Sequence, residues 1–381
     1  MGCNACRPSE QETQLKLSRE SPQIGVKINK SATQIKEDYN NFMNLFENNL
    51  QYIGKYINPQ DFNSCIPENI QNYMIENPLN IKPELFNNNI ETFEVKPIEF
   101  KNGNIYFGNW NDNLKMEGLG KYYLKEDNVL AEGIWSNGDL QYARVFIPNG
   151  DIYEGEMKDS KFNGKGKLTY LNGDLYEGEF LDGEKNGNGK FIFEDKTEYE
   201  GPFEKGEFRG KGKMKWKNGY EYKGDFDGLK LCGFGILTHY MGDTYEGHFS
   251  NSLFNGKGKY TYENGDIYEG EFQYGIKKGK GIYNASHKYE YDGDWDNDLP
   301  CGVGKLTNWN KKGVLKCTWR YGKIMEEPIY EKGSQSDFKA LNLNIEPQEM
   351  NLNVKELSHL EMVDIDTSQY KLGTFPSFLD D

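Results

Sequence analysis

The residues best suited by type and spacing to carry chemistry lie at the start of the chain, which begins MGCNACR. A glycine exposed by removal of the initiator methionine accepts myristate, and cysteines close to it accept palmitate. One myristoyl chain holds a protein on a membrane only weakly, so stable anchoring needs a second fatty acid. We therefore predict lipid attachment at Gly2, Cys3 and Cys6. The alternative is an ordinary terminus with two unmodified thiols, because Cys6 stands where the myristoylation pattern prefers Ser or Thr.

This start resembles the dually acylated (myristoyl/palmitoyl) termini of Src-family kinases and G-protein α subunits. The resemblance implies a protein on the cytoplasmic face of a membrane, either the plasma membrane or the ciliary membrane. The nearby basic residues Arg7, Lys16 and Arg19 are too sparse to form a polybasic patch. A zinc site at Cys3 and Cys6 is not predicted, since no second pair of ligands follows at a suitable spacing.

A run of alternating lysines is the second candidate site. It consists of Lys211, Lys213, Lys215 and Lys217. In a β-strand, residues separated by one position project from the same face, so these four side chains would point the same way. Each such charge contributes about 1 kcal/mol of attraction near an anionic bilayer. We predict a contact with acidic phospholipids here, the alternative being a solvated face neutralised by Glu198, Glu200 and Glu221.

Other patterns begin like ligand-binding motifs without completing them. The recurring Gly-x-Gly pairs lie within expected strands rather than before helices, which argues against phosphate- and dinucleotide-binding loops. Asp294, Asp296 and Asp298 imitate the start of a calcium loop, but Leu299 and Lys305 occupy positions that need Gly and Glu. No spacing suggests a Ser/His/Asp or Cys/His pair. We therefore predict no enzymatic activity, no catalytic residue, no cofactor and no metal.

A 23-residue repeat must position these side chains. Its first position holds Tyr153, Tyr176, Tyr199, Tyr222, Tyr245, Tyr268 and Tyr291. Two residues after each tyrosine comes a glycine, and two residues later a large apolar residue. A pair of glycines then follows, from Gly164/Gly166 in the first unit to Gly302/Gly304 in the last. Self-similarity at this period predicts a repeat architecture in which each unit buries its apolar face on its neighbours.

Each repeat is expected to be a β-hairpin, because apolar and charged residues alternate with a period of two. In the first unit, the loop Asp159–Asn163 joins the two strands. Asn172-Gly173 would lead to the next unit through a turn with positive φ at both residues. Glycine is unfavourable within a strand. Its regular placement among aromatics predicts that each glycine leaves a gap for a ring from a neighbouring strand. The outer face would carry acid on one strand and base on its partner.

The residues Tyr-Glu-Gly-Glu-Phe, then Asn-Gly-Lys-Gly-Lys, then Tyr-x-Asn-Gly-Asp are similar to the MORN (membrane occupation and recognition nexus) repeat. The resemblance extends from about Ile105 to Lys323, which is more than half of the chain. It implies a mainly β fold, an elongated single-layer antiparallel β-meander of about nine MORN repeat hairpins preceded by an N-terminal helical segment. The array departs from the pattern at Tyr142–Arg144, which replaces a glycine pair, and in a last half-unit containing Cys317 and Trp319.

Four regions are expected along the chain: an acylated flexible segment over 1–30, a helical capping region over 31–100, the MORN repeat array over 105–323 and an acidic tail over 324–381. Apolar residues at helical spacing predict a long helix from Ser31 to Ile57, ending at Asn58-Pro59, and a shorter one over Pro67–Asn77. These helices would cap the first repeat or bind a partner. Residues 345–362 could form a docking helix or lie along the repeats.

Composition limits the remaining alternatives. The chain has 381 residues and a net charge of −15, which argues against general nucleic-acid binding. No apolar run approaches the ~20 residues that span a bilayer. The six cysteines are scattered rather than arranged as a disulfide framework, which predicts a reducing, cytoplasmic setting.

The preferred interpretation is a non-catalytic, membrane-associated scaffold. Its repeats would contact protein partners or a second copy of the chain, and acidic phospholipids. The resemblance includes junctophilins, which sit at membrane junctions, and parasite proteins that dimerise through their repeats. The first alternative is a structural subunit of the cilium axoneme or cytoskeleton, similar to radial-spoke head MORN proteins. The second is a regulatory subunit of a lipid or protein kinase.

Overall fold

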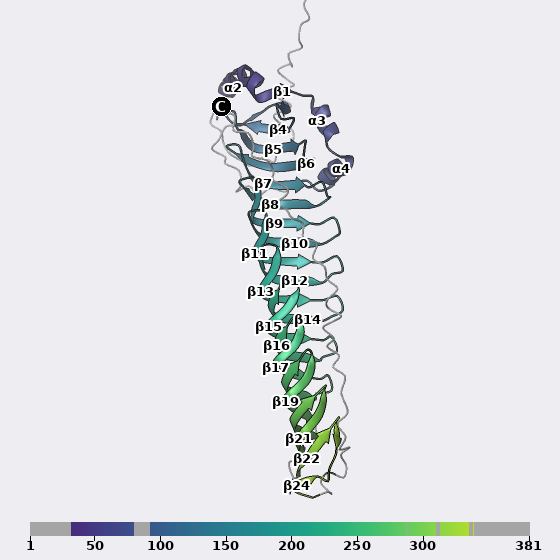
Figure 1. The fold of residues 1–381 in the computed structure, drawn as a ribbon. Coiled ribbons are helices and arrows are strands. Elements are labelled where there is room, and N and C mark those ends of the chain that lie inside the picture. The colour runs from purple at the N-terminus through teal and green to yellow at the C-terminus, as the bar shows by residue number, and fades with distance from the viewer. Residues whose placement is uncertain (1–31, 80–91, 287, 310–312, 335–337, 339–381) are drawn as a thin grey trace, which may run out of the picture. The chain divides into compact units, whose positions relative to one another are not determined.

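The computed structural model describes residues 32–79, 92–286, 288–309, 313–334 and 338 (Figure 1). The predicted acylation sites and the segment 345–362 lie outside these residues. The described chain forms two compact units. The first contains residues 32–79, 92–122 and 133–138, and the second contains 123–132 and the described residues from 139 onward. The predicted mainly β fold, with antiparallel hairpins following a helical segment, is confirmed.

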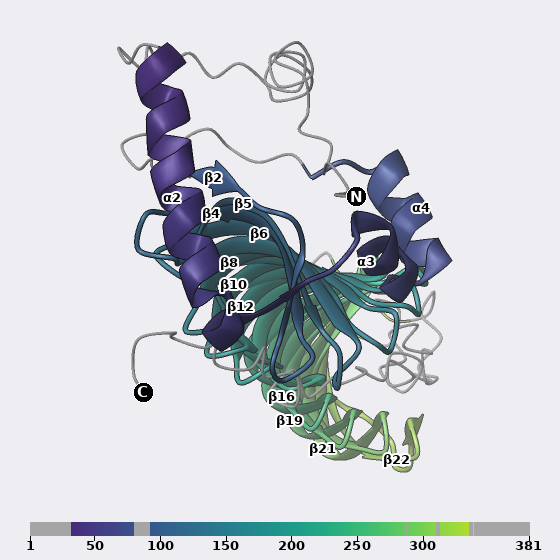
Figure 2. The same ribbon diagram turned by 90° about the horizontal axis from the view of Figure 1, so that it is seen from above.

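The described residues from 32 to 136 contain three helices and six strands. They are α2 (Ala32–Ile53), β1 (Gly54–Tyr56), α3 (Pro59–Cys65), α4 (Glu68–Glu76), β2 (Phe93–Glu94), β3 (Ile98–Phe100), β4 (Ile105–Trp110), β5 (Met116–Leu124) and β6 (Val129–Ser136). The long helix α2 buries Phe42 and Phe46. Phe42 stacks on Phe93 with ring centroids 4.3 Å apart, and Phe46 meets Trp110 edge-on at 5.1 Å. These contacts hold α2 beside β2 and β4, as the ribbon in Figure 2 shows. None of the helices in the described residues is long and apolar enough to cross a bilayer.

The predicted end of the first helix is wrong. The helix stops at Ile53, because Gly54–Tyr56 pairs with β3 as a strand and a Cβ on Gly54 would overlap the carbonyl oxygen of Glu99. Asn58-Pro59 does not end a helix but begins α3, in which the Asn58 side chain accepts a hydrogen bond from the backbone N–H of Gln60. The shorter predicted helix is α4, within one residue at each end.

The second unit is a succession of antiparallel hairpins. Its strands are β7 (Asp139–Phe146), β8 (Ile152–Lys158), β9 (Lys161–Thr169), β10 (Leu175–Leu181), β11 (Glu184–Ile192), β12 (Glu198–Glu204), β13 (Glu207–Lys215), β14 (Glu221–Asp227), β15 (Lys230–Thr238), β16 (Thr244–Ser250), β17 (Leu253–Thr261), β18 (Ile267–Gln273), β19 (Ile276–Ala285), β20 (Tyr289–Asp296), β21 (Leu299–Asn308), β22 (Val314–Arg320), β23 (Lys323–Ile324) and β24 (Ile329–Lys332). From β7 to β22 each strand pairs with the next in sequence. The predicted arrangement of two strands per repeat is therefore confirmed.

The repeated tyrosines form the core of this sheet, as predicted. All seven have no exposed surface. Tyr199 is typical, since its ring stacks on Phe208 with centroids 3.8 Å apart and meets Phe226 edge-on at 5.0 Å. Its hydroxyl donates a hydrogen bond of 2.9 Å to the carbonyl oxygen of Pro202. Burial raises the pKa of Tyr199 well above its usual value. Each ring thus joins two neighbouring hairpins while its polar tip remains satisfied.

The glycines of a repeat serve two different purposes. Gly201 and Gly212 lie under the Tyr199 ring, and a Cβ on Gly212 would lie 2.7 Å from its Cε2 atom. For these positions the predicted gap beneath a ring is confirmed, although Tyr199 reaches Gly201 from the same strand. For the first glycine of each Gly-x-Gly pair, such as Gly210 in the pair Gly210/Gly212, the prediction of such a gap is wrong. Gly210 instead has φ +67° at a shift in the strand register, which is a β-bulge.

The predicted turn geometry is also wrong. At Asn172-Gly173 only the glycine has positive φ, and Gly173 donates its N–H to the carbonyl oxygen of Tyr170 at 3.0 Å. This is a three-residue loop ending in a left-handed glycine. Turns with positive φ at both central residues occur at the other ends of the strands, as at Asp159-Ser160 between β8 and β9. That two-residue connection is shorter than the predicted loop over 159–163.

Buried aspartates tie successive turns together. The carboxylate of Asp174 accepts a hydrogen bond of 2.8 Å from the side-chain amide of Asn172 in its own turn. It accepts a second, of 2.7 Å, from the backbone N–H of Glu194 in the next turn. Asp151, Asp243 and Asp266 are placed in the same way. Since these carboxylates are almost fully buried, losing one partner would leave a costly unsatisfied charge.

The repeat that lacks its glycine pair is held by a buried ion pair. Ala143 lies opposite Gly155, and Arg144 donates hydrogen bonds of 2.8 and 2.5 Å to the carboxylate of Glu132. The last half-unit forms as predicted, with Cys317 opposite Gly304 in the sheet. Within the predicted acidic tail, β24 forms a strand that pairs with β22.

Candidate functional site

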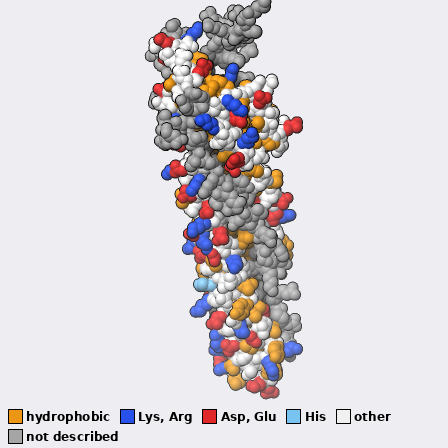
Figure 3. Space-filling model, turned by 45° about the horizontal axis from the view of Figure 1, so that its top comes forward, with side chains coloured by type: hydrophobic (Ala, Val, Ile, Leu, Met, Phe, Trp, Pro, Cys, Tyr) orange, Lys and Arg blue, Asp and Glu red, His pale blue; other side chains and the backbone are white. Residues whose placement is uncertain are grey.

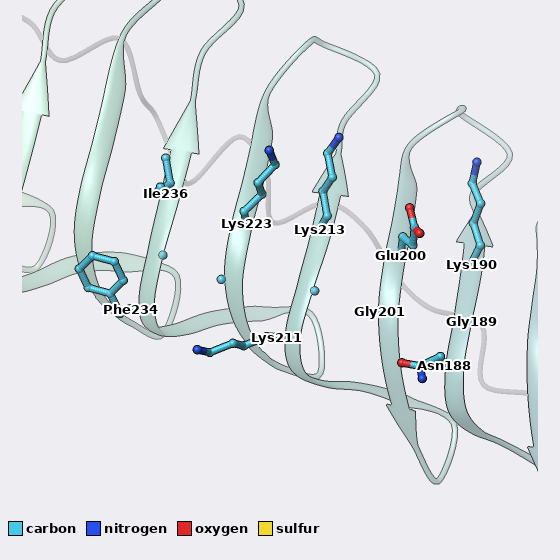
Figure 4. A pocket seen from close by; sticks show the side chains of 13 residues that line it. Asn188, Gly189, Lys190, Glu200, Gly201, Lys211, Lys213, Lys223, Phe234 and Ile236 are labelled. Atoms are coloured by element: carbon cyan, nitrogen blue, oxygen red, sulfur yellow. The ribbon is translucent and has the colours of Figure 1, made fainter.

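An open groove of about 970 Å³ lies on the exposed face of the second unit (Figure 4). Glycines from the tyrosine core form its floor, because their missing side chains leave the backbone bare. These are Gly189, Gly201, Gly212, Gly224 and Gly235. The walls carry four lysines and one acid, namely Lys190, Lys211, Lys213, Lys223 and Glu200. Although the chain as a whole has a charge of −15, the lining of this groove is cationic.

Two lysines stand directly opposite one another in this groove. Lys213 of β13 pairs with Lys223 of β14, and Figure 4 shows both side chains pointing the same way. On its other side Lys223 faces Ile236 of β15, so neither cross-strand neighbour is an acid. Like charges opposite one another destabilise a sheet. An anionic group placed between the two lysines would relieve this repulsion.

Other repeats neutralise the same position. Lys259 is the counterpart of Lys213 two repeats later and lies between Glu246 and Glu269. The counterparts of Lys223 in six of the seven repeats are acidic: Glu154, Glu177, Glu200, Glu246, Glu269 and Asp292. Over the visible face of the sheet, acidic and basic side chains are interspersed (Figure 3). The groove is thus a local exception to the charge pairing expected for the whole outer face.

In a second pair of facing lysines, a nearby acid reduces the repulsion. Lys305 lies opposite Lys316, but Glu331 of β24 forms a 2.9 Å ion pair with Lys305. In the groove Lys190 forms an ion pair of 2.9 Å with Glu198, but Lys213 meets Glu221 only at 3.7 Å. Among the described residues, no carboxylate forms an ion pair with Lys223 or Lys211.

An apolar patch borders the lysines. Phe234 and Ile236 of β15 line the groove, and the two residues are 49% and 40% exposed. In the first three repeats the same two positions hold Lys or Asn. Sequence reasoning missed these residues because alternation alone assigns them to a solvated face. The available signal was their departure from the polar residues at equivalent repeat positions.

The structure separates the four lysines of the predicted stripe. Lys211 and Lys213 line the groove. Lys215 lies at the end of β13, 3.8 Å from Glu221, and Lys217 follows the strand in a turn. Arg209, which flanks the stripe in sequence, pairs with Asp227 and with Glu204 and contributes no charge to the groove. The predicted lipid-attachment residues Gly2, Cys3 and Cys6 lie outside the described residues.

The incomplete calcium motif has a structural explanation. Asp294 forms a 2.7 Å ion pair with Lys280, and Asp298 accepts a hydrogen bond from the backbone N–H of Lys277. These carboxylates therefore serve the strands and turns around them. In the described part of the chain, no three His, Cys, Asp or Glu side chains gather as a metal site.

Comparison with protein families finds the MORN repeat at residues 153–175, 176–198, 199–219, 245–267, 268–284 and 291–308. The segment 220–244, which carries Lys223, Phe234 and Ile236, is not matched. Within residues 153–308, the unmatched repeat is thus the one that supplies Lys223 and the apolar patch of the groove.

No curated protein matches the sequence. Among solved structures, the TCP10 domain of Danio rerio CPAP aligns with 49% of this chain and 86% of its own length, at 12% identity and a TM-score of 0.30. The TCP domain of Drosophila melanogaster SAS-4, in complex with a proline-rich motif of Ana2, aligns with 41% of this chain and 85% of its own length, at 16% identity and a TM-score of 0.28. These TM-scores are too low to support a conclusion about fold or function. Residues 153–308 of this chain carry six MORN repeats.

Proposed function

We propose that this protein is a non-catalytic scaffold that works at the cytoplasmic face of a membrane. The groove is the observation that carries the proposal, because four lysines line it against one acid, and Lys223 has no acid opposite it on either adjacent strand. A surface of this kind attracts anionic groups, at about 1 kcal/mol per lysine near a phosphatidylserine-rich bilayer. The remaining exposed face, with its paired charges, would contact protein partners.

The proposal includes anchoring by fatty acids at Gly2, Cys3 and Cys6. Its support is the sequence of these residues, and the attraction of the groove alone is modest. Acyl chains would bring the sheet to the bilayer, and the groove would then select acidic headgroups. Two weak contacts on one chain raise each other's occupancy through their high effective concentration.

Vesicle sedimentation of the unacylated full chain tests the groove. We expect more binding to phosphatidylcholine vesicles that contain phosphatidylserine than to pure phosphatidylcholine. Lys213→Glu/Lys223→Glu should reduce this binding by at least about tenfold, since two attractive charges become repulsive. Lys257→Glu/Lys259→Glu is the matched control, with the same change of charge two repeats away. An equal loss in both variants would show that diffuse charge, and not the groove, carries the interaction.

Metabolic labelling with an alkynyl myristate tests the anchor independently. The wild type should take up label and Gly2→Ala should not, while Cys3→Ser/Cys6→Ser should release the protein from membranes. An unlabelled wild type would remove the anchor from the proposal. Protein that stays with microtubules after detergent extraction would instead favour a structural subunit of the axoneme.

A further inference from the structure

We propose that an acidic segment of this same chain, Glu356–Asp366, occupies the lysine-lined groove. The segment reads ELSHLEMVDID and lies outside the described residues. It contains four carboxylates and no lysine or arginine, with five aliphatic or methionine side chains between them. The groove offers the complementary set, which is lysine ammonium groups beside Phe234 and Ile236.

The charge balance favours an acidic chain segment over a neutral one. Lys223 has no acidic neighbour across either adjacent strand, and Lys213 has one only on the side of Glu200. A carboxylate placed between Lys213 and Lys223 would form charge-assisted hydrogen bonds with both. Other parts of the exposed face, such as that around Lys259, already carry their own acids and would repel the segment.

The apolar patch adds a second requirement that a purely acidic partner would not meet. Phe234 and Ile236 stand on the strand next to Lys223, and both are about half exposed. The five strands from β11 to β15 span about 19 Å at roughly 4.8 Å per strand, which about six extended residues would cross. Any six residues of Glu356–Asp366 include both acidic and apolar side chains. One short stretch can therefore pair with the lysines and also cover Phe234 and Ile236.

The chain is long enough to make this contact within one molecule. The last described residue, Phe338, packs against Tyr330 of β24, which pairs with β22. Nine strand spacings separate β22 from β13, or about 43 Å along the sheet. The 17 residues between Phe338 and Glu356 reach roughly 56 Å or more when extended. A tether of this length gives an effective concentration in the millimolar range, which favours the chain's own segment over a second copy.

With the segment bound, the groove would not be available to acidic headgroups. The segment and an acidic headgroup both need the charges of Lys213 and Lys223, so they would compete for the same place. Membrane contact through the groove would then require displacement of the segment. The proposal shares the groove with the membrane contact above, but it is tested without lipid, so that the two can fail separately.

Zero-length carbodiimide cross-linking of the full chain in dilute solution, followed by mass spectrometry, is the test. This reagent joins a carboxylate to an amine that already touches it. We expect cross-links from Lys213 and Lys223 to Glu361, Asp364 or neighbouring acids of the segment, and at least tenfold fewer from Lys257 and Lys259. Mixing isotopically light and heavy protein distinguishes contacts within one chain from contacts between two.

A charge exchange provides the second arm. Glu361→Lys/Asp364→Lys should abolish these cross-links. Combining that change with Lys213→Glu/Lys223→Glu should restore cross-linking between the same positions with the partners reversed. The proposal is overturned by equal cross-linking at Lys257 and Lys259, by light–heavy cross-links as the main product, or by no product at the groove. Failure of the wild-type chain to bind phosphatidylserine vesicles, with the cross-links at the groove present, would overturn the membrane contact alone.

Discussion

Two repeats of the same sheet place different residues against the repeated tyrosine. In the repeat that begins at Tyr199, the neighbouring position is Phe208, and the two rings stack 3.8 Å apart. In the repeat that begins at Tyr268, the equivalent residue is Lys277, which is only 2% exposed. Its ammonium group lies 5.3–6.0 Å from the centres of four aromatic rings. The sheet therefore accepts either a ring or a cation against the repeated tyrosine.

The difference shows what the glycine and tyrosine scaffold tolerates. Lys277 is surrounded by Tyr262, Tyr268, Tyr283 and Trp295, whose ring faces attract a cation. Burial nevertheless lowers the pKa of Lys277 to about 8, with the nearby charge of Asp298 opposing the shift. The cation thus remains less favourable in the core than in water, whereas Phe208 carries no such cost.

The largest effect is expected where a ring lies on a ring. Tyr199→Ala removes a fully buried side chain that stacks on Phe208, and the bare glycines beneath it cannot fill the space. We expect a loss of about 3–5 kcal/mol in the free energy of unfolding, measured by urea denaturation. Tyr268→Ala should cost less, because Lys277 could then reach solvent through the cavity. Equal losses in the two repeats would contradict the comparison.

An intermediate effect that depends on pH is expected at the buried lysine. Below pH 8 Lys277 is charged in both states, and above it the folded state releases the proton while the unfolded state holds it up to about 10.5. Because the unfolded state then binds more protons, stability should rise with pH, by about 2 kcal/mol between pH 7 and 9.5. The cysteines Cys232, Cys301 and Cys317, whose pKa values burial raises, oppose this trend from about pH 9, and the buried tyrosines do so above about pH 10.

Lys277→Met isolates this contribution. The variant should be more stable than the wild type at pH 7, and its stability should not rise between pH 7 and 9.5. Thermal unfolding in matched buffers gives both quantities. A slope that survives in Lys277→Met would assign the pH dependence to another group.

The smallest effect is expected at the hydrogen bonds that link successive turns, which also differ between the two repeats. Asp266 accepts a 2.6 Å hydrogen bond from the hydroxyl of Tyr283, whereas Thr197 at the equivalent turn meets only a backbone N–H, at 3.3 Å. Tyr283→Phe should cost about 1.5 kcal/mol in urea denaturation, because a buried carboxylate loses a donor. Tyr262→Phe is the control, since its buried hydroxyl has no hydrogen-bond partner among the described residues. Similar losses in both variants would remove the role assigned to the Asp266 bond.

Much of the fold followed from the sequence, while the site followed only in part. The 23-residue period predicted the hairpins, and the tyrosines proved to be buried. The lysine stripe gave two groove residues, Lys211 and Lys213. It did not give Phe234 or Ile236, because spacing along one strand says nothing about the residues on the strand beside it.

Errors in the prediction arose where tertiary contacts decide local structure. The long helix was predicted to continue to Ile57, but pairing of Gly54–Tyr56 with β3 ends it at Ile53. The first glycine of each pair was assigned to the core, although Gly210 allows a bulge instead. The strand at Gly54–Tyr56 depends on pairing with residues 98–100, far along the chain, and the bulge depends on the register between β12 and β13, which alternation within one strand does not reveal.

By itself, the sequence determined the alternation of faces and the period of the repeat, because both depend on residues a few positions apart in one strand. Only the tertiary structure decided that Lys213 lies opposite Lys223, with Ile236 on the next strand. Those neighbours depend on the register of three strands, which the bulges and the two-residue turns fix together. The charge of the groove is therefore a property of the assembled sheet and not of any one segment.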